Sequence, residues 1–280
     1  MKKILSTLIP HLYGQWLNVI AIFSPTRAAK IGFQIFTTIR KGRVLPQQKS
    51  FLDAAKHSVE TIKGHQVQAY SWPGTKPTVL LLHGWESNTH RWHKLIAKLR
   101  EHQYHVLAFD APAHGYSTGK KLHVPLYAEV LRHFINTHKP TFLIGHSMGG
   151  MTALYDHYLH PQTTVRKIVT IGSPCEFEGF MHHYQNLLKF NQRVWDAMDQ
   201  GLKQWFGYHF TEFSSARFVA ENTLPGLLFH DKLDKQVPYT ASVKVHEHWK
   251  NSQLILTEGL GHSMHQDEVN EQIIGFLEAT

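Results

Sequence analysis

The chain has 280 residues, 42% of them hydrophobic and 18% charged, which suits a globular protein of one large domain or a domain with an insertion. Its one cysteine, Cys175, excludes an internal disulfide and fits a reducing compartment such as the cytoplasm. The formal net charge of +8 comes from one part of the chain. Residues 1–50 hold eight Lys or Arg and no Asp or Glu, whereas residues 51–280 hold 21 of each sign. Because the body is neutral and shows no basic stripe with interleaved aromatics, we expect no nucleic-acid partner.

The first apolar segment covers residues 4–23, which carry no charge and follow two lysines, as in a signal peptide. Pro10, Gly14 and Asn18 interrupt the apolar run, and no cleavage site of small residues follows it. A membrane-spanning helix needs about 20 predominantly apolar residues with fewer interruptions. Neither a cleaved leader nor a membrane span is therefore the favoured interpretation.

An amphipathic pattern follows this segment. Its apolar face carries Ala28, Ile31, Ile35 and Ile39, and its polar face carries Arg27, Lys30, Gln34 and Lys41. Such a helix, with Tyr13 and Trp16 upstream, is typical of a segment that lies on an anionic membrane. The alternatives are a pair of helices packed on the body and a cleaved targeting segment. We therefore expect residues 1–50 to form a basic helical extension, with peripheral contact with the inner face of the membrane as one interpretation.

From residue 51 onward, strand and helix patterns alternate. We expect strands at 58–62, 66–72, 78–82, 105–109, 141–144, 167–171, 224–230 and 253–256, and helices at about 88–101, 125–138, 151–159, 239–249 and 267–279. The continuous apolar runs are typical of strands buried on both faces. The pattern predicts an α/β core over residues 51–173 and 223–280, with a mostly parallel sheet covered by helices on both faces. Ligands bind such sheets at the carboxyl ends of the strands.

Residues 174–222 interrupt this alternation, because the interval is far longer than a strand-to-strand connection requires. The interval carries eleven aromatic residues: Phe177, Phe180, Tyr184, Phe190, Trp195, Trp205, Phe206, Tyr208, Phe210, Phe213 and Phe218. We expect a helical cap inserted after a strand end. Most of its aromatic side chains would form its own small core, and some would face the carboxyl edge of the sheet.

The pentapeptide Gly145-His146-Ser147-Met148-Gly149 stands between the strand pattern of 141–144 and the helix pattern of 151–159. A serine at a sharp strand-to-helix turn adopts a strained backbone conformation and needs glycine on both sides. Its hydroxyl then projects at the N-terminus of the helix, where developing negative charge is favoured. Ser147 is therefore the candidate nucleophile.

A serine nucleophile needs a base and an orienting carboxylate. Asp231 and Asp234 both follow the strand pattern that ends at residue 230. We favour Asp234 because Val237-Pro238 follows it, closing the loop just before a helix. Asp231 is expected to brace the loop.

His262 and His265 both follow the last strand, on the same face of the sheet as Ser147, and the order Ser, Asp, His is the one expected of this architecture. We favour His262 because Gly259-Leu260-Gly261 provides a flexible approach for the imidazole. The oxyanion hole is expected to consist of the backbone N–H groups of Met148 and Trp85.

With these motifs in order, residues 78–280 resemble the α/β-hydrolase family. The motifs that carry the resemblance are His83-Gly84 after a buried strand, Asp110 with Gly115 and Ser117, the Gly145–Gly149 turn, Asp234 with Pro238, and Gly261-His262. The resemblance implies hydrolysis through a serine acyl-enzyme, as in bacterial esterases and lysophospholipase-like members with a helical cap. The chain departs from the family pattern at Ala113, where many members have glycine. That departure affects packing more than chemistry.

The leading functional hypothesis is hydrolysis of a carboxylic ester with an apolar acyl or aromatic group. A thioester, a carbon–carbon bond or a peptide bond could be cleaved by the same triad, and a peptide substrate would use acidic cap residues such as Glu176 and Glu178. A non-catalytic binding module on this fold is the alternative from another class, although such modules usually lack part of the triad. No cofactor is expected, and the adjacent pair His182-His183 lacks the spacing of metal ligands.

Overall fold

The computed structural model describes residues 2–279, with side chains described from Leu8 onward. The chain divides into two compact units. One unit comprises Met1–Thr38 and Glu176–Ser214, and the other comprises Ile39–Cys175 and Ser215–Thr280. The second unit contains an eight-stranded sheet and is called the core unit below. The first contains only helices and short connections and is called the helical unit.

These units differ from the expected domains at three borders, one of which moves only residues 174–175 into the core unit. Residues 39–50 belong to the core unit rather than to an N-terminal extension, because the Arg43 guanidinium donates to the carbonyl of Ser117 at 2.5 Å and the Ile39 N–H donates to the carbonyl of Lys120 at 3.0 Å. Residues 215–222 also belong to the core unit, in which α9 packs against α6 and α10. The insertion that leaves the core is therefore shorter than 174–222.

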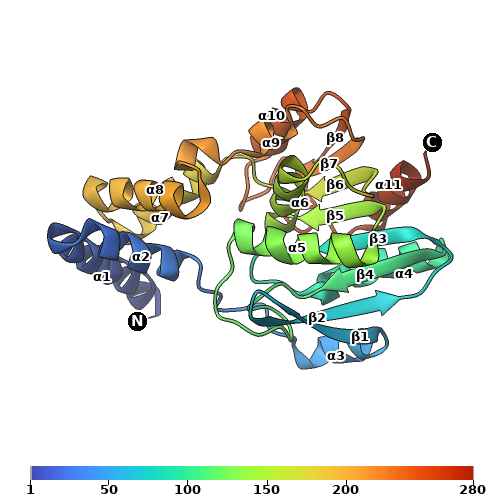
Figure 1. Cartoon of the computed structure of the whole chain (residues 1–280), viewed down its shortest axis with the longest axis horizontal. Helices are drawn as coiled ribbons and strands as arrows, with labels where there is room; N and C mark the ends of the chain where they lie inside the picture. The colour runs from blue at the N-terminus through green and yellow to red at the C-terminus, as the bar shows by residue number, and fades with distance from the viewer. Residues whose placement is uncertain (1, 280) are drawn as a thin grey trace. The chain divides into compact units, whose positions relative to one another are not determined.

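The core unit is built on a single sheet (Figure 1). Its strands are β1 Lys56–Ile62, β2 His65–Trp72, β3 Lys76–Leu82, β4 Tyr104–Phe109, β5 Phe142–His146, β6 Lys167–Ile171, β7 Gly226–Asp231 and β8 Ser252–Thr257. Their spatial order is β1-β2-β4-β3-β5-β6-β7-β8. The strands β3 to β8 run parallel, while β1 and β2 form an antiparallel hairpin at one edge. This arrangement confirms the predicted fold class.

Helices cover both faces of the sheet. The core unit contains η1 Pro46–Gln48, α3 Lys49–Asp53, η2 Thr89–Trp92, α4 His93–Glu101, α5 Val124–His138, α6 Met148–Leu159, α9 Ser215–Val219, α10 Thr240–His248 and α11 Asp267–Glu278. Along β3, Leu80 and Leu82 join the cluster under α5, α6, α9 and α10, whereas Val79 and Leu81 join the cluster under α3, α4 and α11. The apolar run of β3 is continuous because alternate side chains are buried on opposite faces.

The helical unit brings the first 38 residues together with the insertion. It contains α1 Lys2–Phe23, α2 Pro25–Phe36, α7 Phe177–Leu188, α8 Gln192–Phe206 and η3 Phe210–Glu212. Its core combines Leu17 of α1 and Ala28 of α2 with Met181 and Val194 of the insertion. Most aromatic side chains of the insertion pack in or against this cluster, so the insertion forms a small core together with the N-terminal helices.

The apolar face of α2 is therefore not available to a membrane, which corrects that part of the N-terminal expectation. Ala28 is fully buried, and Ile31 and Ile35 are partly buried against the cluster. Gly32 lies so close to α8 that a Cβ atom would stand 2.8 Å from the sulfur of Met198, and its carbonyl accepts a hydrogen bond from the Tyr184 hydroxyl. Over residues 2–279, no helix combines the length and apolar character needed to cross a membrane.

Candidate active site

The candidate residues follow the carboxyl ends of neighbouring parallel strands. Ser147 comes directly after β5, Trp85 three residues after β3, Asp234 three residues after β7, and His262 five residues after β8. The β3, β5, β6, β7 and β8 strands are consecutive in the sheet and end at one edge. Their loops therefore converge at the edge where ligands bind in open α/β sheets.

Ser147 adopts a strained backbone conformation, with φ 51° and ψ −121°. The turn around it leaves no room for side chains, because a Cβ atom on Gly145 would stand 2.5 Å from the Gly149 carbonyl carbon, and one on Gly149 would stand 2.4 Å from the Leu82 carbonyl oxygen. Contacts that short require the backbone to shift, so both positions need glycine. Strain of this kind persists only where the surrounding structure holds it, and it concentrates at functional sites.

Hydrogen bonds on both sides hold the turn in place. The Ser147 N–H donates to the Ile171 carbonyl at 2.8 Å, and the Ser173 hydroxyl donates to the Ser147 carbonyl at 3.2 Å. The α6 helix begins at Met148, so Ser147 stands at its N-terminus. The positive end of the helix dipole and the backbone N–H groups of the first turn favour negative charge beside this residue.

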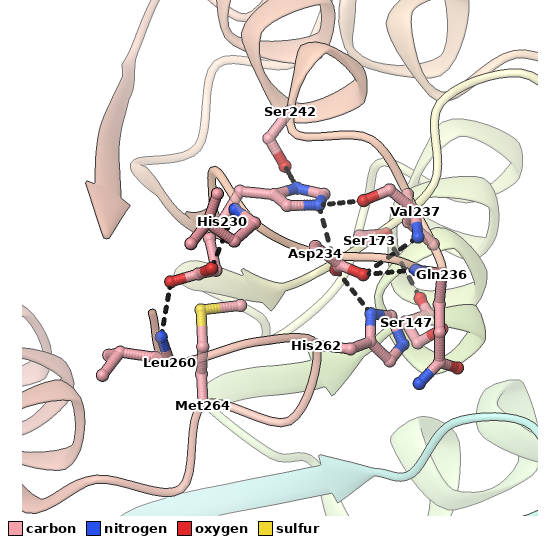
Figure 2. Close-up of polar contacts among 12 residues, drawn as sticks. Ser147, Ser173, His230, Asp234, Gln236, Val237, Ser242, Leu260, His262 and Met264 are labelled. Atoms are coloured by element: carbon pink, nitrogen blue, oxygen red, sulfur yellow. Dashed lines mark hydrogen bonds and ion pairs between the residues drawn. The ribbon is translucent and has the colours of Figure 1, made fainter. Parts of the chain in front are cut away.

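Asp234 and His262 are in direct contact. A hydrogen bond joins their Nδ1 and Oδ2 atoms, which are 2.6 Å apart (Figure 2). The Asp234 side chain is fully buried. The other Asp234 oxygen accepts hydrogen bonds from the N–H groups of Gln236, at 2.8 Å, and Val237, at 3.0 Å. These donors satisfy the carboxylate and fix its orientation. Asp234 as the acceptor places a proton on His262 Nδ1 and leaves Nε2 free to accept one.

Asp231 has a different set of partners. Its carboxylate accepts hydrogen bonds from the Thr257 hydroxyl at 2.8 Å and from the N–H groups of Leu260, at 2.8 Å, and Leu233, at 2.9 Å. Burial alone would raise the pKa of Asp231, but these hydrogen bonds outweigh it and hold the pKa below its usual value. Asp231 therefore ties the loop after β7 to the loop after β8.

His230 also contacts Asp234, and sequence patterns do not point to it. Its Nε2 atom lies 3.0 Å from the Val237 carbonyl and 3.3 Å from Asp234 Oδ2, and its Nδ1 atom lies 2.7 Å from the Ser242 hydroxyl (Figure 2). Nε2 thus carries the proton, and Nδ1 accepts one from the serine. Burial lowers the pKa of His230, which keeps the ring neutral beside the carboxylate. The position of His230 near the end of a buried strand could have marked it as a candidate, but only the fold shows that it contacts Asp234.

His262 lies against the turn that carries Ser147. The neighbouring His146 ring donates through Nε2 to the His262 carbonyl at 2.9 Å, and the two rings are 4.7 Å apart. Gly172, next to the residue that accepts the Ser147 N–H, is so close that a Cβ atom would stand 3.2 Å from His262 Nδ1. The structure thus places His262, which contacts Asp234, against the backbone on both sides of the Ser147 turn.

The alternative base, His265, lies in the same loop as His262. Burial, together with the nearby positive charge of Arg91, lowers the pKa of His265 to about 4. Among the hydrogen bonds of residues 2–279, none joins His265 to Asp231 or Asp234. It therefore lacks an orienting carboxylate, which His262 has.

The loop after β3 approaches Ser147 closely. A Cβ atom on Gly84 would stand 3.1 Å from the Ser147 Cβ and 2.8 Å from His146 Nδ1, so only glycine fits there. The backbone N–H of Trp85 follows directly, and Met148 is the residue after the serine. The two N–H groups expected to form an oxyanion hole thus belong to segments on either side of Ser147.

His83 holds this loop. Its Nδ1 atom lies 2.8 Å from the Gly84 carbonyl, and its Nε2 atom accepts a hydrogen bond from the Ala111 N–H at 2.9 Å. These partners require a proton on Nδ1 and none on Nε2. Burial lowers the pKa of His83 to about 4, so the ring is neutral at physiological pH and keeps both hydrogen bonds.

The Asp110 motif has a structural role in this arrangement. Its carboxylate accepts hydrogen bonds from the Tyr70 hydroxyl, at 2.8 Å, and the Thr89 N–H, at 2.9 Å. Gly115 is required beside it, because a Cβ atom there would stand 1.8 Å from the carboxylate. Ala113 adopts a φ of 70°, a conformation that glycine takes at lower cost, so alanine at this position introduces backbone strain. No cluster of three or more His, Cys, Asp or Glu suited to a metal occurs within residues 2–279.

Comparison with known proteins agrees with this architecture. The sequence profile of the family described as alpha/beta hydrolase fold matches residues 77–233, more than half of the chain. The chain belongs to that family. An esterase of Mycobacterium tuberculosis is 34% identical over 103 residues, which make up 34% of this chain and 33% of that protein. A pimeloyl-[acyl-carrier protein] methyl ester esterase of Vibrio vulnificus is 32% identical over 106 residues, 37% of this chain and 40% of that protein.

Solved structures share the fold. An esterase from Exiguobacterium antarcticum superposes with a TM-score of 0.63 at 20% identity, covering 80% of this chain and 100% of that one. A thioesterase domain from the curacin biosynthetic pathway superposes with a TM-score of 0.60 at 16% identity, covering 79% and 99%. The matches to the curated relatives above span between a third and two fifths of their lengths, so their activities do not transfer directly to this chain.

Proposed function

We propose that the protein is a serine hydrolase that cleaves a carboxylic ester through an acyl-enzyme. Ser147 is the nucleophile, His262 the general base and then the general acid, and Asp234 the carboxylate that orients the imidazole. The observation that carries the proposal is the 2.6 Å contact between His262 Nδ1 and the buried Asp234 carboxylate, in a histidine packed against the strained turn of Ser147. A purely structural serine would not need that constellation.

In the first half of the proposed reaction, the Ser147 hydroxyl attacks the ester carbonyl carbon while His262 Nε2 takes the hydroxyl proton. The resulting imidazolium is stabilised by the Asp234 carboxylate, whose other oxygen accepts hydrogen bonds from two backbone N–H groups. Collapse of the tetrahedral intermediate transfers the proton from His262 to the leaving alcohol. Water then repeats these steps on the acyl-enzyme and releases the acid.

Negative charge on the carbonyl oxygen develops in both halves of the reaction. We assign its stabilisation to the N–H groups of Met148, at the start of α6, and Trp85, in the loop held by His83. Backbone donors set by a helix N-terminus and a rigid loop need no reorganisation when the charge appears, and loss of one such donor typically costs about 10²–10³ in kcat. Because a side-chain substitution removes neither backbone N–H group, substitutions of the triad residues provide the test.

The substrate we propose is an ester with an apolar acyl or aromatic group. Esterases among the relatives support the ester bond. We base the apolar group on the eleven aromatic residues of the insertion, because an unpaired carboxylate buried beside aromatic rings would cost several kcal/mol. A cytoplasmic location remains a proposal that rests on the single cysteine.

The direct experiment compares wild type with Ser147→Ala. We expect a fluorophosphonate probe to label the wild type and not the variant, and turnover of p-nitrophenyl butyrate to fall to a small residue while the circular dichroism spectrum is unchanged. Labelling of both proteins would refute Ser147 as the nucleophile. Absence of both labelling and turnover in the wild type would favour a non-catalytic module.

A screen then separates the bond types. We expect p-nitrophenyl esters of short and medium chain length to be cleaved in preference to the matching thioesters and to amino-acid p-nitroanilides. We also expect butyryl esters to be better substrates than succinyl esters in kcat/KM. A preference for the succinyl ester would contradict the apolar assignment, and preference for a thioester or anilide would replace the ester assignment.

A further inference from the structure

The α1 helix of the helical unit is apolar on two opposite faces. A helix that is apolar all round is normally buried on all sides. Between residues 4 and 26 the chain carries no Asp, Glu, Lys or Arg. Only one of the two faces of α1 packs against the rest of its unit, which leaves the other without a partner among the described residues.

The packed face of α1 is held firmly. Gly14 lies so close to the end of α7 that a Cβ atom would stand 1.8 Å from the Leu188 carbonyl oxygen. Leu17 and Ala21, on the same side, are fully buried. The Asn18 side chain accepts a hydrogen bond from the Asn191 N–H at 2.8 Å. These contacts determine the rotation of α1 about its axis, so the helix cannot turn its second face inward.

The second face is a continuous exposed stripe. Its members are exposed large hydrophobic residues spaced at helical intervals, namely Leu8, Ile9, Leu12, Tyr13, Trp16, Val19, Ile22 and Phe23. Leu12 is 66% exposed and Phe23 84%. Ile9, Leu12, Tyr13 and Trp16 line a shallow hollow of about 400 Å³. We call these eight residues the outer stripe of α1. An apolar surface of this extent usually marks an interaction site.

Basic residues flank the outer stripe on both sides in the sequence. Two lysines precede the apolar run in the sequence, and Arg27 and Lys30, both exposed, follow Phe23 within two turns of α2. No acidic residue occurs before Asp53. Tyr13 and Trp16, in the middle of the stripe, have the amphipathic rings that favour the boundary between hydrocarbon and headgroups. An apolar stripe that is followed by the exposed cations Arg27 and Lys30 complements an anionic lipid surface.

We propose that the outer stripe of α1 lies in the headgroup boundary of an anionic membrane, with Arg27 and Lys30 at the level of the lipid phosphates. The helix would rest in the plane of the surface rather than cross it. A second copy of the chain is a poorer occupant, because pairing of two outer stripes would bring together two segments whose only charged residues are basic. This inference does not rest on the proposed catalytic activity.

The test is co-sedimentation of the full chain with vesicles of phosphatidylglycerol and phosphatidylcholine, compared with vesicles of phosphatidylcholine alone. We expect wild type to bind the anionic vesicles and to be released by raising the salt concentration. The double variant Leu12→Ser/Trp16→Ser should bind at least tenfold more weakly. Leu187→Ser, a matched change at an exposed leucine of α7 in the same unit, should bind like wild type.

Charge is tested separately with Arg27→Gln/Lys30→Gln, which should weaken binding to anionic vesicles and reduce its salt dependence. Turnover of a water-soluble ester and the unfolding midpoint should be the same in all variants, which separates this proposal from the catalytic one. Equal binding of wild type and the Leu12/Trp16 variant would overturn the proposal. The proposal would also be overturned if light scattering showed that the wild type is a dimer that does not bind vesicles, and that the Leu12/Trp16 variant is a monomer.

Discussion

At the scale of single residues, two aspartates three positions apart have separate tasks. The Asp234 carboxylate receives His262 Nδ1 and two backbone N–H groups, whereas the Asp231 carboxylate receives a hydroxyl and backbone N–H groups of the two loops. Both side chains are buried, so burial does not distinguish them. Their partners do, and the difference leads to opposite expectations for the two substitutions.

Asp234→Asn should lower kcat by about 10⁴-fold, because the amide cannot hold His262 in the tautomer that leaves Nε2 unprotonated. Asp231→Asn should instead reduce the free energy of unfolding by about 1–3 kcal/mol, because an amide NH₂ would face the N–H groups that now donate to an oxygen. Ester turnover and urea unfolding of both variants provide the measurements. If Asp231→Asn proves the more damaging to kcat, the proposed assignment of the acid is wrong.

At the scale of elements, the turn between β5 and α6 depends on backbone contact without side chains. Gly149 packs against the Leu82 carbonyl at the end of β3, so the turn and its neighbouring strand determine each other. The strained φ of Ser147 is kept by this contact and by the hydrogen bond to Ile171. Loss of either glycine in the turn should therefore affect stability and activity together.

Gly149→Ala should destabilise the protein by about 3 kcal/mol or more, since its Cβ would stand 2.4 Å from a backbone oxygen that cannot move freely. The matched control is Gly275→Ala in α11, where a Cβ atom meets nothing within 4 Å. That change should stabilise the protein by about 0.5–1 kcal/mol, the usual gain of alanine over glycine in a helix. Thermal unfolding of both variants measures the difference, and equal effects would contradict the close-contact account.

At the scale of the whole molecule, several histidines are kept neutral by burial. Burial lowers the pKa of His83 to about 4, of His114 to about 3 and of His123 to about 4. The unfolded chain binds protons at these sites from about pH 6.5 downward, while the folded chain does not. Stability is therefore fully present above pH 6.5 and is lost as the pH falls toward 4.

For each such histidine, the free energy of unfolding should be about 2 kcal/mol lower at pH 5 than at pH 7.5. His123 permits a clean test, because its Nδ1 atom accepts the Leu126 N–H at the start of α5, a role that asparagine also performs. His123→Asn should match wild type at pH 7.5 and lose less stability at pH 5. Parallel pH curves for wild type and His123→Asn would refute the assignment.

The sequence alone determined the class of fold and the order of the candidate site. Strand and helix periods are local properties, so the α/β alternation and the turn around Ser147 could be predicted from neighbouring residues. The glycines of that turn were also predictable, because the backbone geometry of a sharp strand-to-helix turn excludes side chains. Because strand patterns are local, the segments that carry Trp85 and His262 could also be placed at the carboxyl ends of their strands.

Only the tertiary structure decided which groups meet. The contact of Asp234 with His262 joins residues 28 positions apart, and the contact of His230 with the same carboxylate depends on the shape of a loop, which no local period encodes. The pairing of α1 and α2 with α7 and α8 joins segments more than 130 residues apart. An amphipathic pattern shows that a helix has an apolar face but not what covers it. That choice rests on packing between distant segments, which here buries the apolar face of α2 and leaves the outer stripe of α1 exposed.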